Sequence, residues 1–266
     1  MRPFSINQIT TLRWPFERDL EFFAGVGVSN IGVSIVKLEE CGIGRGVLLL
    51  RESGLRVSCL TSSGVFPLGD AAGEAAAVER TLRHIDLAAE IGADCLMILP
   101  GNGIQLAWEE SAVRARVVIE KLLPAAQASR VRLAVESANP LQAELSFLRS
   151  FDEVLDFAAE IRSPWLGAVL EVNEAWGERR LYKNLRYRTE MIALVQVSDF
   201  KVGTVSVSDR VVPGDGDVPL RRIFRALSEA GYRGWYDIEL VGPRIESEGY
   251  ESVVPRAMQR FEELWS

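Results

Sequence analysis

Short apolar runs alternate with longer amphipathic runs along the whole chain, and this order is the strongest constraint on its fold. Each apolar run has the length of a buried strand, and each amphipathic run has the apolar spacing of a helix. Strands separated by helices pair in parallel through right-handed crossovers. Eight such units with no segment left over predict a single (β/α)8 TIM barrel domain over residues 1–266, close to the roughly 250 residues typical of that fold.

The expected elements follow one another without a long linker. A doubly wound open sheet is the alternative, but it normally carries a glycine fingerprint after its first strand, and NQITTLRWP contains no glycine. The expected strands are 3–9, 28–35, 55–61, 94–101, 131–137, 166–172, 192–199 and 235–240; the expected helices are 15–25, 38–53, 71–91, 109–129, 151–161, 179–190, 219–230 and 251–265.

Composition and charge exclude several classes of partner. The net charge of -7 disfavours nucleic acid and anionic membranes, which require a basic face. The basic residues between 179 and 188 are typical of a solvated helix face. The start of the chain lacks the apolar segment of a secretory signal, and no run reaches the roughly 18 apolar residues of a membrane span. Three cysteines without CxxC spacing indicate a reducing compartment, so we expect a cytoplasmic protein.

Four polar side chains stand at the carboxyl ends of four successive strands in the second half of the chain. They are Glu136 in VRLAVES, Glu171 in LGAVLEV, Gln196 in ALVQVSD and Glu239 in WYDIEL. In a (β/α)8 barrel this end of the strands carries the active site. Strand alternation places Glu136 on the face of Ala134, and Glu239 on the face of Asp237. If these faces line the lumen, the four side chains converge.

Such a cluster predicts a bound cation, because buried carboxylates without compensation are costly. Oxygen donors alone favour Mg²⁺ or Mn²⁺ over zinc. The only histidine, His84, lies in a predicted helix and is expected to be a packing or surface residue, which excludes a histidine-based zinc site. A set of strand-end salt bridges is the alternative explanation for the four residues.

The chain resembles the xylose isomerase-like barrel superfamily over nearly its whole length. The resemblance is carried by AAEIGADCLMILPG, LAVESANP, VQVSDFK, RVVPGDGDVPL and GYRGWYDIEL. It implies one divalent metal held by Glu136, Glu171, Gln196 and Glu239, with Glu136 and Glu239 as the catalytic proton-transfer pair. Epimerase-like and dehydratase-like members usually have Asp where this chain has Glu171. The endonuclease IV branch needs several histidines and is excluded.

The implied chemistry is metal-dependent isomerisation or epimerisation of a sugar or polyol-like hydroxy-ketone by proton transfer through an enediolate. A carbohydrate or polyol is therefore the expected partner. A metal-dependent lyase or dehydratase acting on a cyclic polyol or aromatic compound is the first alternative, because elimination of water starts from the same enediolate. A non-catalytic ligand-binding barrel is the second. The oligomeric state is left open between monomer and homo-oligomer.

Five further residues are candidates for substrate binding. Arg210 lies in the long segment 201–218, and an Arg at this place in the resembling family reaches substrate oxygens; we expect the segment to cover the barrel mouth. The second candidate, Asp199, is expected either to touch substrate or to orient a neighbour, and Glu174 stands where many members have His. Trp14 and Trp108 follow strands, where rings stack on apolar ligand faces.

Overall fold

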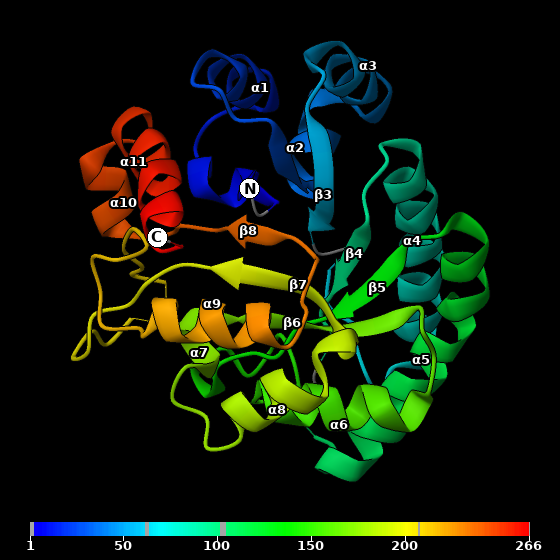
Figure 1. Cartoon of the computed structure of the whole chain (residues 1–266). Coiled ribbons are helices and arrows are strands. Elements are labelled where there is room, and N and C mark those ends of the chain that lie inside the picture. Colours follow the sequence, from blue (N-terminus) through cyan, green and yellow to red (C-terminus); the bar gives the residue numbers. More distant parts are fainter. Residues whose placement is uncertain (1–2, 62–63, 102–104, 207, 266) are drawn as a thin grey trace.

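The computed structural model describes residues 3–61, 64–101, 105–206 and 208–265, and within them eight parallel strands close into one barrel (Figure 1). The strand order follows the sequence, and β8 closes the ring by pairing with β1. The predicted (β/α)8 fold is therefore confirmed. The strands are β1 (Phe4–Asn7), β2 (Asn30–Ser34), β3 (Arg56–Thr61), β4 (Cys95–Ile98), β5 (Arg132–Val135), β6 (Leu166–Glu171), β7 (Ile192–Val197) and β8 (Tyr236–Ile238).

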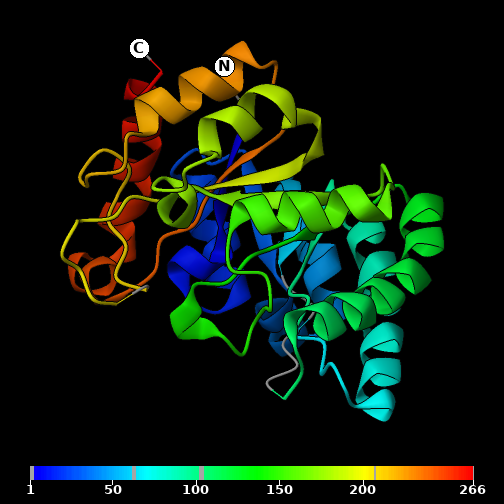
Figure 2. The same ribbon diagram turned by 90° about the horizontal axis from the view of Figure 1, so that it is seen from below.

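Helices surround the ring of strands, as Figures 1 and 2 show from two directions. None of the helices in the described ranges is long and apolar enough to cross a membrane. The helices are α1 (Phe16–Gly25), α2 (Ile35–Cys41), α3 (Ile43–Ser53), α4 (Ala71–Glu90), α5 (Trp108–Ser129), α6 (Phe151–Ile161), α7 (Val172–Ala175), α8 (Leu181–Tyr187), α9 (Leu220–Glu229), α10 (Pro243–Glu248) and α11 (Tyr250–Glu263), with 3-10 turns η1 (Gln8–Thr11), η2 (Pro140–Gln142) and η3 (Thr189–Met191).

Short polar side chains begin several of these helices. Ser34, Asp70 and Ser150 precede α2, α4 and α6, and each accepts a hydrogen bond from a backbone N–H in the first turn. This satisfies one of the donors that a helix start leaves unpaired. Gly54 ends α3 in the left-handed conformation, with φ of 69°, which glycine adopts without a steric penalty.

Three helix predictions need correction. The expected single helix 38–53 is two helices, because Gly42 has φ of 90° and separates α2 from α3. The expected helix 179–190 is shorter, since α8 spans Leu181–Tyr187 and a 3-10 turn follows. The helix α10 between β8 and α11 was not predicted.

Alternate strand residues divide the apolar core into two parts. One set, including Leu60, Leu96 and Leu133, belongs to the large cluster that joins strands to helices. Their neighbours along the same strands form a separate cluster, which the alternation of strand side chains places inside the barrel. The inner cluster contains Cys59, Cys95, Met97, Ala134, Val169, Leu194 and Trp235, so two of the cysteines are small core residues.

Candidate active site

The four predicted donor residues lie at the carboxyl ends of four neighbouring strands. Glu171 is the last residue of β6 and stands in register with Gln196 of β7. Glu136 and Glu239 directly follow β5 and β8. In Figure 1 the arrowheads of β7 and β8 point towards the yellow segment that follows β7, so this segment and the four residues share one end of the barrel.

Arg210, from that segment, links two of the carboxylates. Its Nη1 donates to Glu239 Oε1 at 3.0 Å and lies 3.1 Å from Glu171 Oε2. The amide of Gln196 donates from Nε2 to the other oxygen of Glu239 at 2.6 Å. Arg210 is only 8% exposed, so its charge acts inside the site. The Glu239 carboxylate is therefore held through both oxygens.

Glu171 accepts hydrogen bonds through one oxygen only. Its Oε1 accepts from the backbone N–H of Asn173 at 3.3 Å and from Ser198 Oγ at 3.4 Å. Asn173 in turn donates to Ser198 Oγ at 3.0 Å, which orients that hydroxyl. Among the described residues Glu171 Oε2 has no hydrogen-bond partner, although Arg210 is close enough for an ion pair. Burial raises the pKa of Glu171 to about 8, and Arg210 opposes this only in part.

Glu136 and Glu174 add further negative charge to the same place. No hydrogen bond from the described residues reaches the Glu136 carboxylate, and burial followed by repulsion from Glu239 and Glu171 holds its pKa well above the usual range. Burial also raises the pKa of Glu174, and Arg210 opposes that rise. A single guanidinium, that of Arg210, therefore faces the carboxyl groups of Glu136, Glu171, Glu174 and Glu239.

The oxygen donors of this cluster are of the kind that binds a hard divalent cation. In the described ranges, however, no three His, Cys, Asp or Glu side chains are already arranged to hold a metal ion. Arg210 bridges Glu171 and Glu239, so its guanidinium supplies the positive charge there. Two buried oxygens, Gln196 Oε1 and Glu171 Oε2, lack a hydrogen-bond partner within these ranges. Buried acceptors without a donor are unusual, and a cation would satisfy them.

A known protein family matches most of this chain. The sequence profile described as "Xylose isomerase-like TIM barrel" matches residues 34–263. The chain belongs to the xylose isomerase-like TIM barrel family. The L-ribulose-5-phosphate 3-epimerase UlaE of Salmonella paratyphi A is 28% identical over 213 residues, which cover 77% of this chain and 72% of that protein.

Two solved structures of similar fold cover nearly the whole chain. Protein SMc04130 from Sinorhizobium meliloti 1021 superposes with a TM-score of 0.89 at 25% identity, covering 98% of each chain. The IolI protein, whose structure contains a zinc atom, superposes with a TM-score of 0.87 at 20% identity, covering 98% of this chain and 97% of its own. At this level of identity the IolI likeness shows the fold alone.

Of the two roles expected for Asp199, substrate contact or orientation of a neighbour, its hydrogen bonds support the second. Its Oδ1 accepts the backbone N–H groups of Phe200 and Val218 at 2.8 and 3.0 Å. The other oxygen, Oδ2, accepts those of Gly214 and Gly216 at 2.8 and 3.0 Å. Both oxygens are therefore occupied by the segment that carries Arg210. Asp199 fixes the shape of that segment instead of facing a ligand.

The two tryptophan candidates differ in exposure. Trp14 is 9% exposed, and its ring packs edge-on against Phe22 and Tyr250 at 5.2 Å from each. The expected substrate contact of Trp14 is therefore replaced by a packing role, because neighbouring rings enclose it. Trp108 begins α5, is 44% exposed and contacts Phe147, so its ring keeps a free face.

Sequence reasoning missed the role of Asp237, although it placed Asp237 and Glu239 on one face of the strand. The Asp237 side chain is fully buried inside the barrel and accepts from Ser5 Oγ at 2.5 Å and Asn7 Nδ2 at 2.6 Å. The Cys59 thiol is a third, weaker donor at 3.6 Å. Burial raises the pKa of Asp237 to about 7, while these donors oppose the rise.

A second missed feature is the buried ion pair of Asp19 in α1 with Lys37 in α2. Lys37 Nζ lies 2.7 Å from Asp19 Oδ2 and also donates to the backbone oxygen of Thr11 at 2.7 Å. Gln8 Nε2 donates to the same carboxylate oxygen at 3.0 Å. Charged residues in amphipathic segments are usually solvated, so the sequence contained no signal for this pair.

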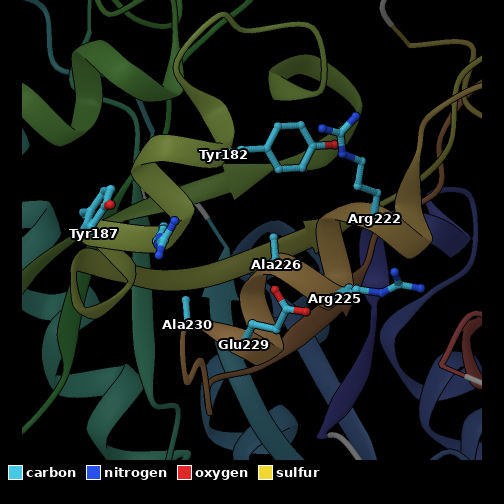
Figure 3. Close-up of a pocket in the computed structure, with 8 residues that line it drawn as sticks. Tyr182, Tyr187, Arg222, Arg225, Ala226, Glu229 and Ala230 are labelled. Carbon is cyan, nitrogen blue, oxygen red and sulfur yellow. The ribbon is translucent and has the colours of Figure 1, made fainter.

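A separate basic groove of about 880 Å³ lies on the outside of the barrel between α8 and α9. Figure 3 shows Tyr182 and Tyr187 from α8 and Arg222 and Arg225 from α9. The Arg222 guanidinium lies over the Tyr182 ring, 4.3 Å from its centroid. None of the residues at the strand ends lines this groove, so it is distinct from the candidate active site.

Proposed function

We propose that this protein is a divalent-metal-dependent isomerase or epimerase that acts on a sugar or polyol-like hydroxy-ketone by proton transfer through an enediolate. The supporting observation is the set of strand-end side chains around Arg210, in which Glu171 Oε2 and Gln196 Oε1 are buried without a hydrogen-bond partner in the described residues. Such acceptors are retained at a cost in stability unless a ligand satisfies them.

Glu136, Glu171, Gln196 and Glu239 would hold the cation, as Mn²⁺ or Mg²⁺. When bound, a cation of this kind polarises a carbonyl and a neighbouring hydroxyl and so acidifies the carbon-bound proton. The oxygen-only donor set supports this choice of metal. The zinc atom in the IolI structure accords with divalent metal binding at the level of the shared fold.

Proton transfer is assigned to Glu136 and Glu239. One carboxylate removes the proton from the carbon next to the carbonyl, and the other returns a proton to that carbon from the opposite face or to its neighbour. Glu239 is fixed for this role by Gln196 and Arg210 at 2.6 and 3.0 Å. Glu136 directly follows β5 at the same end of the barrel, and burial with the neighbouring carboxylates raises its pKa.

Arg210 would offset the negative charge that the substrate develops when the proton is lost. Its guanidinium already lies within the cluster, paired with Glu171 and Glu239. The name of the Salmonella relative, an L-ribulose-5-phosphate 3-epimerase, supports an activity of this type on a carbohydrate.

Solvent deuterium exchange tests the proposal. The protein would be stripped with EDTA, reloaded with Mn²⁺ or Mg²⁺, and mixed in D₂O with a panel of ketoses and cyclic ketones. We expect metal-dependent incorporation of deuterium next to the carbonyl of at least one compound. Deuterium exchange that persists in EDTA would show that the reaction does not need a metal ion. A folded, metal-loaded protein without exchange on any compound would favour the ligand-binding barrel, and a dehydrated product would favour the lyase.

A further inference from the structure

A small depression adjoins the carboxylate cluster at the barrel mouth. It has a volume of about 260 Å³, and Asn173 and Glu174 line it from the β6 side. Phe200, Thr204 and Val205 line it from the segment after β7. Because Asn173 and Glu174 lie two and three residues after Glu171, a substrate that reaches the cluster would place its remote end in this depression.

The lining of the depression contains a carboxylate and no cation. Glu174 is half-buried there, while the other lining groups are amide, hydroxyl and apolar side chains without any Lys or Arg. Val205 is 91% exposed, so an apolar surface is available to a ligand. A phosphate placed here would face the Glu174 carboxylate, and no Lys or Arg lines the depression to bind the phosphate.

Most of the cations on the loops around the mouth are engaged elsewhere. The loops after β3 and β4, residues 62–70 and 99–107, contain no Lys or Arg at all. Arg149, Arg179 and Lys201 do not line the depression. Among the described residues, five cations at this end pair with carboxylates: Arg13 with Glu246, Lys37 with Asp19, Arg180 with Asp152, Arg210 with Glu171 and Glu239, and Arg244 with Asp209.

The backbone does not supply an anion site in the segment after β7 either. In many (β/α)8 enzymes, phosphate binds to N–H groups of the loops after the last two strands. Here the glycine-rich segment turns the N–H groups of Gly214 and Gly216 inward, in the manner of an anion-binding nest. Asp199 fills that nest, since its two oxygens accept four N–H groups from this segment.

We propose that the substrate is an unphosphorylated polyhydroxy ketone with an uncharged remote end, and that Glu174 and the Asp199-filled nest exclude phosphate esters. This inference rests on the proposed function and specifies its substrate class. The proposed substrate lacks the phosphate of L-ribulose 5-phosphate, which is the substrate named for the Salmonella relative. The hydroxyl groups of a neutral substrate can donate to Glu174, whereas a phosphate cannot.

The test compares L-ribulose with L-ribulose 5-phosphate, using deuterium exchange by the metal-loaded protein and binding by calorimetry. We expect kcat/KM for exchange on L-ribulose to exceed that on its phosphate by about tenfold or more, because buried like charges repel strongly. The Glu174→Lys variant should narrow this ratio several-fold. Glu120→Lys makes the same charge change on the exposed face of α5 and should leave the ratio unchanged.

The outcomes separate this inference from the proposed function. A preference of the wild-type protein for L-ribulose 5-phosphate, in exchange or in binding, would overturn the inference while supporting the isomerase proposal. An unchanged ratio in Glu174→Lys would remove Glu174 as the discriminating group. If neither sugar exchanges, the calorimetric affinities remain informative. Tighter binding of L-ribulose than of its phosphate would support the inference about the substrate class but not the proposed isomerase activity. Binding of neither sugar would count against both proposals.

Discussion

Two kinds of buried carboxylate occupy this barrel, and they differ in how many donors reach them. Asp199 accepts four backbone N–H groups, and Asp237 accepts two strong side-chain donors with a thiol nearby. Glu171, by contrast, has one oxygen without a hydrogen-bond partner in the described residues. No hydrogen bond from those residues reaches the carboxylate of Glu136.

The difference separates structural carboxylates from those that await a ligand. A buried carboxylate with its donors in place stabilises the chain segments that provide them, as Asp199 does for the segment carrying Arg210. A buried carboxylate without donors reduces stability and is expected where a ligand completes it. The following predictions alter Glu239 and Arg210 in the candidate site, the donor-saturated Asp199, and the buried pair of Asp19 and Lys37.

The largest expected effect is on turnover. Glu239→Gln keeps an oxygen donor and nearly the same shape but cannot act as a base, so exchange on the true substrate should fall by about 10³-fold or more. The fold should persist, as circular dichroism would show. Glu229→Gln, an exposed residue of α9 in the outer groove, is the matched control and should exchange at the wild-type rate. Near-normal exchange by Glu239→Gln would end its assignment as a base.

The next largest effect is on the free energy of unfolding and concerns Asp199, whose two oxygens accept four backbone N–H groups. Asp199→Ala leaves four backbone N–H groups without their acceptor, which should lower the free energy of unfolding by about 3–4 kcal/mol in urea denaturation. Asp217→Ala is the control, because Asp217 in the same segment accepts one exposed N–H, from Val202. Equal losses in the two variants would contradict the structural role of Asp199.

The buried pair of Asp19 and Lys37 predicts a pH dependence. Burial raises the pKa of Asp19 from 3.8 to about 6, so the folded state binds its proton more tightly than the unfolded state. The resulting stabilisation is present below pH 4 and is lost as the pH rises through about 6. Relative to Asp19→Asn, which does not titrate, the wild-type free energy of unfolding should fall by about 3 kcal/mol across this window.

Urea denaturation of both proteins between pH 4 and pH 7 measures this difference. A difference that rises with pH would mean that Lys37 lowers the pKa of Asp19 more than burial raises it. The pair would then behave as a strong ion pair, and the sign of its contribution would be the reverse of that expected here.

The barrel could be predicted from the sequence because each strand or helix leaves a pattern within a few neighbouring residues. Alternation of apolar residues, spaced over a few positions, identified every strand and most helices. It failed where one residue overrides the pattern, as Gly42 does between α2 and α3. It also failed for α10, because a six-residue helix that begins at Pro243 is too short to show an amphipathic period.

The candidate site was predictable in position but not in its contacts. Strand alternation alone placed Glu171 and Gln196 side by side at the mouth, as the register of β6 and β7 shows. The partners of Asp199 lie up to 19 residues away, and the two strong donors to Asp237, Ser5 and Asn7, lie more than 200 residues away. Saturation by such donors depends on tertiary structure, so sequence reasoning left Asp199 open between substrate contact and an orienting role.

The smallest expected effect is on cation affinity and concerns Arg210. Its guanidinium bridges Glu171 and Glu239, so in the metal-free protein it competes with a cation for those oxygens. Arg210→Ala removes a positive charge within a few ångströms of the cation and should tighten Mn²⁺ binding by about three- to tenfold, while slowing exchange. Calorimetric titration of the stripped protein with Mn²⁺ measures the affinity independently of turnover. Arg244→Ala, whose partner Asp209 lies outside the cluster, should bind Mn²⁺ like the wild type. Weaker binding by Arg210→Ala would show instead that the arginine holds the carboxylates in the geometry the cation needs, and the unsatisfied oxygens would then depend on Arg210 for their position.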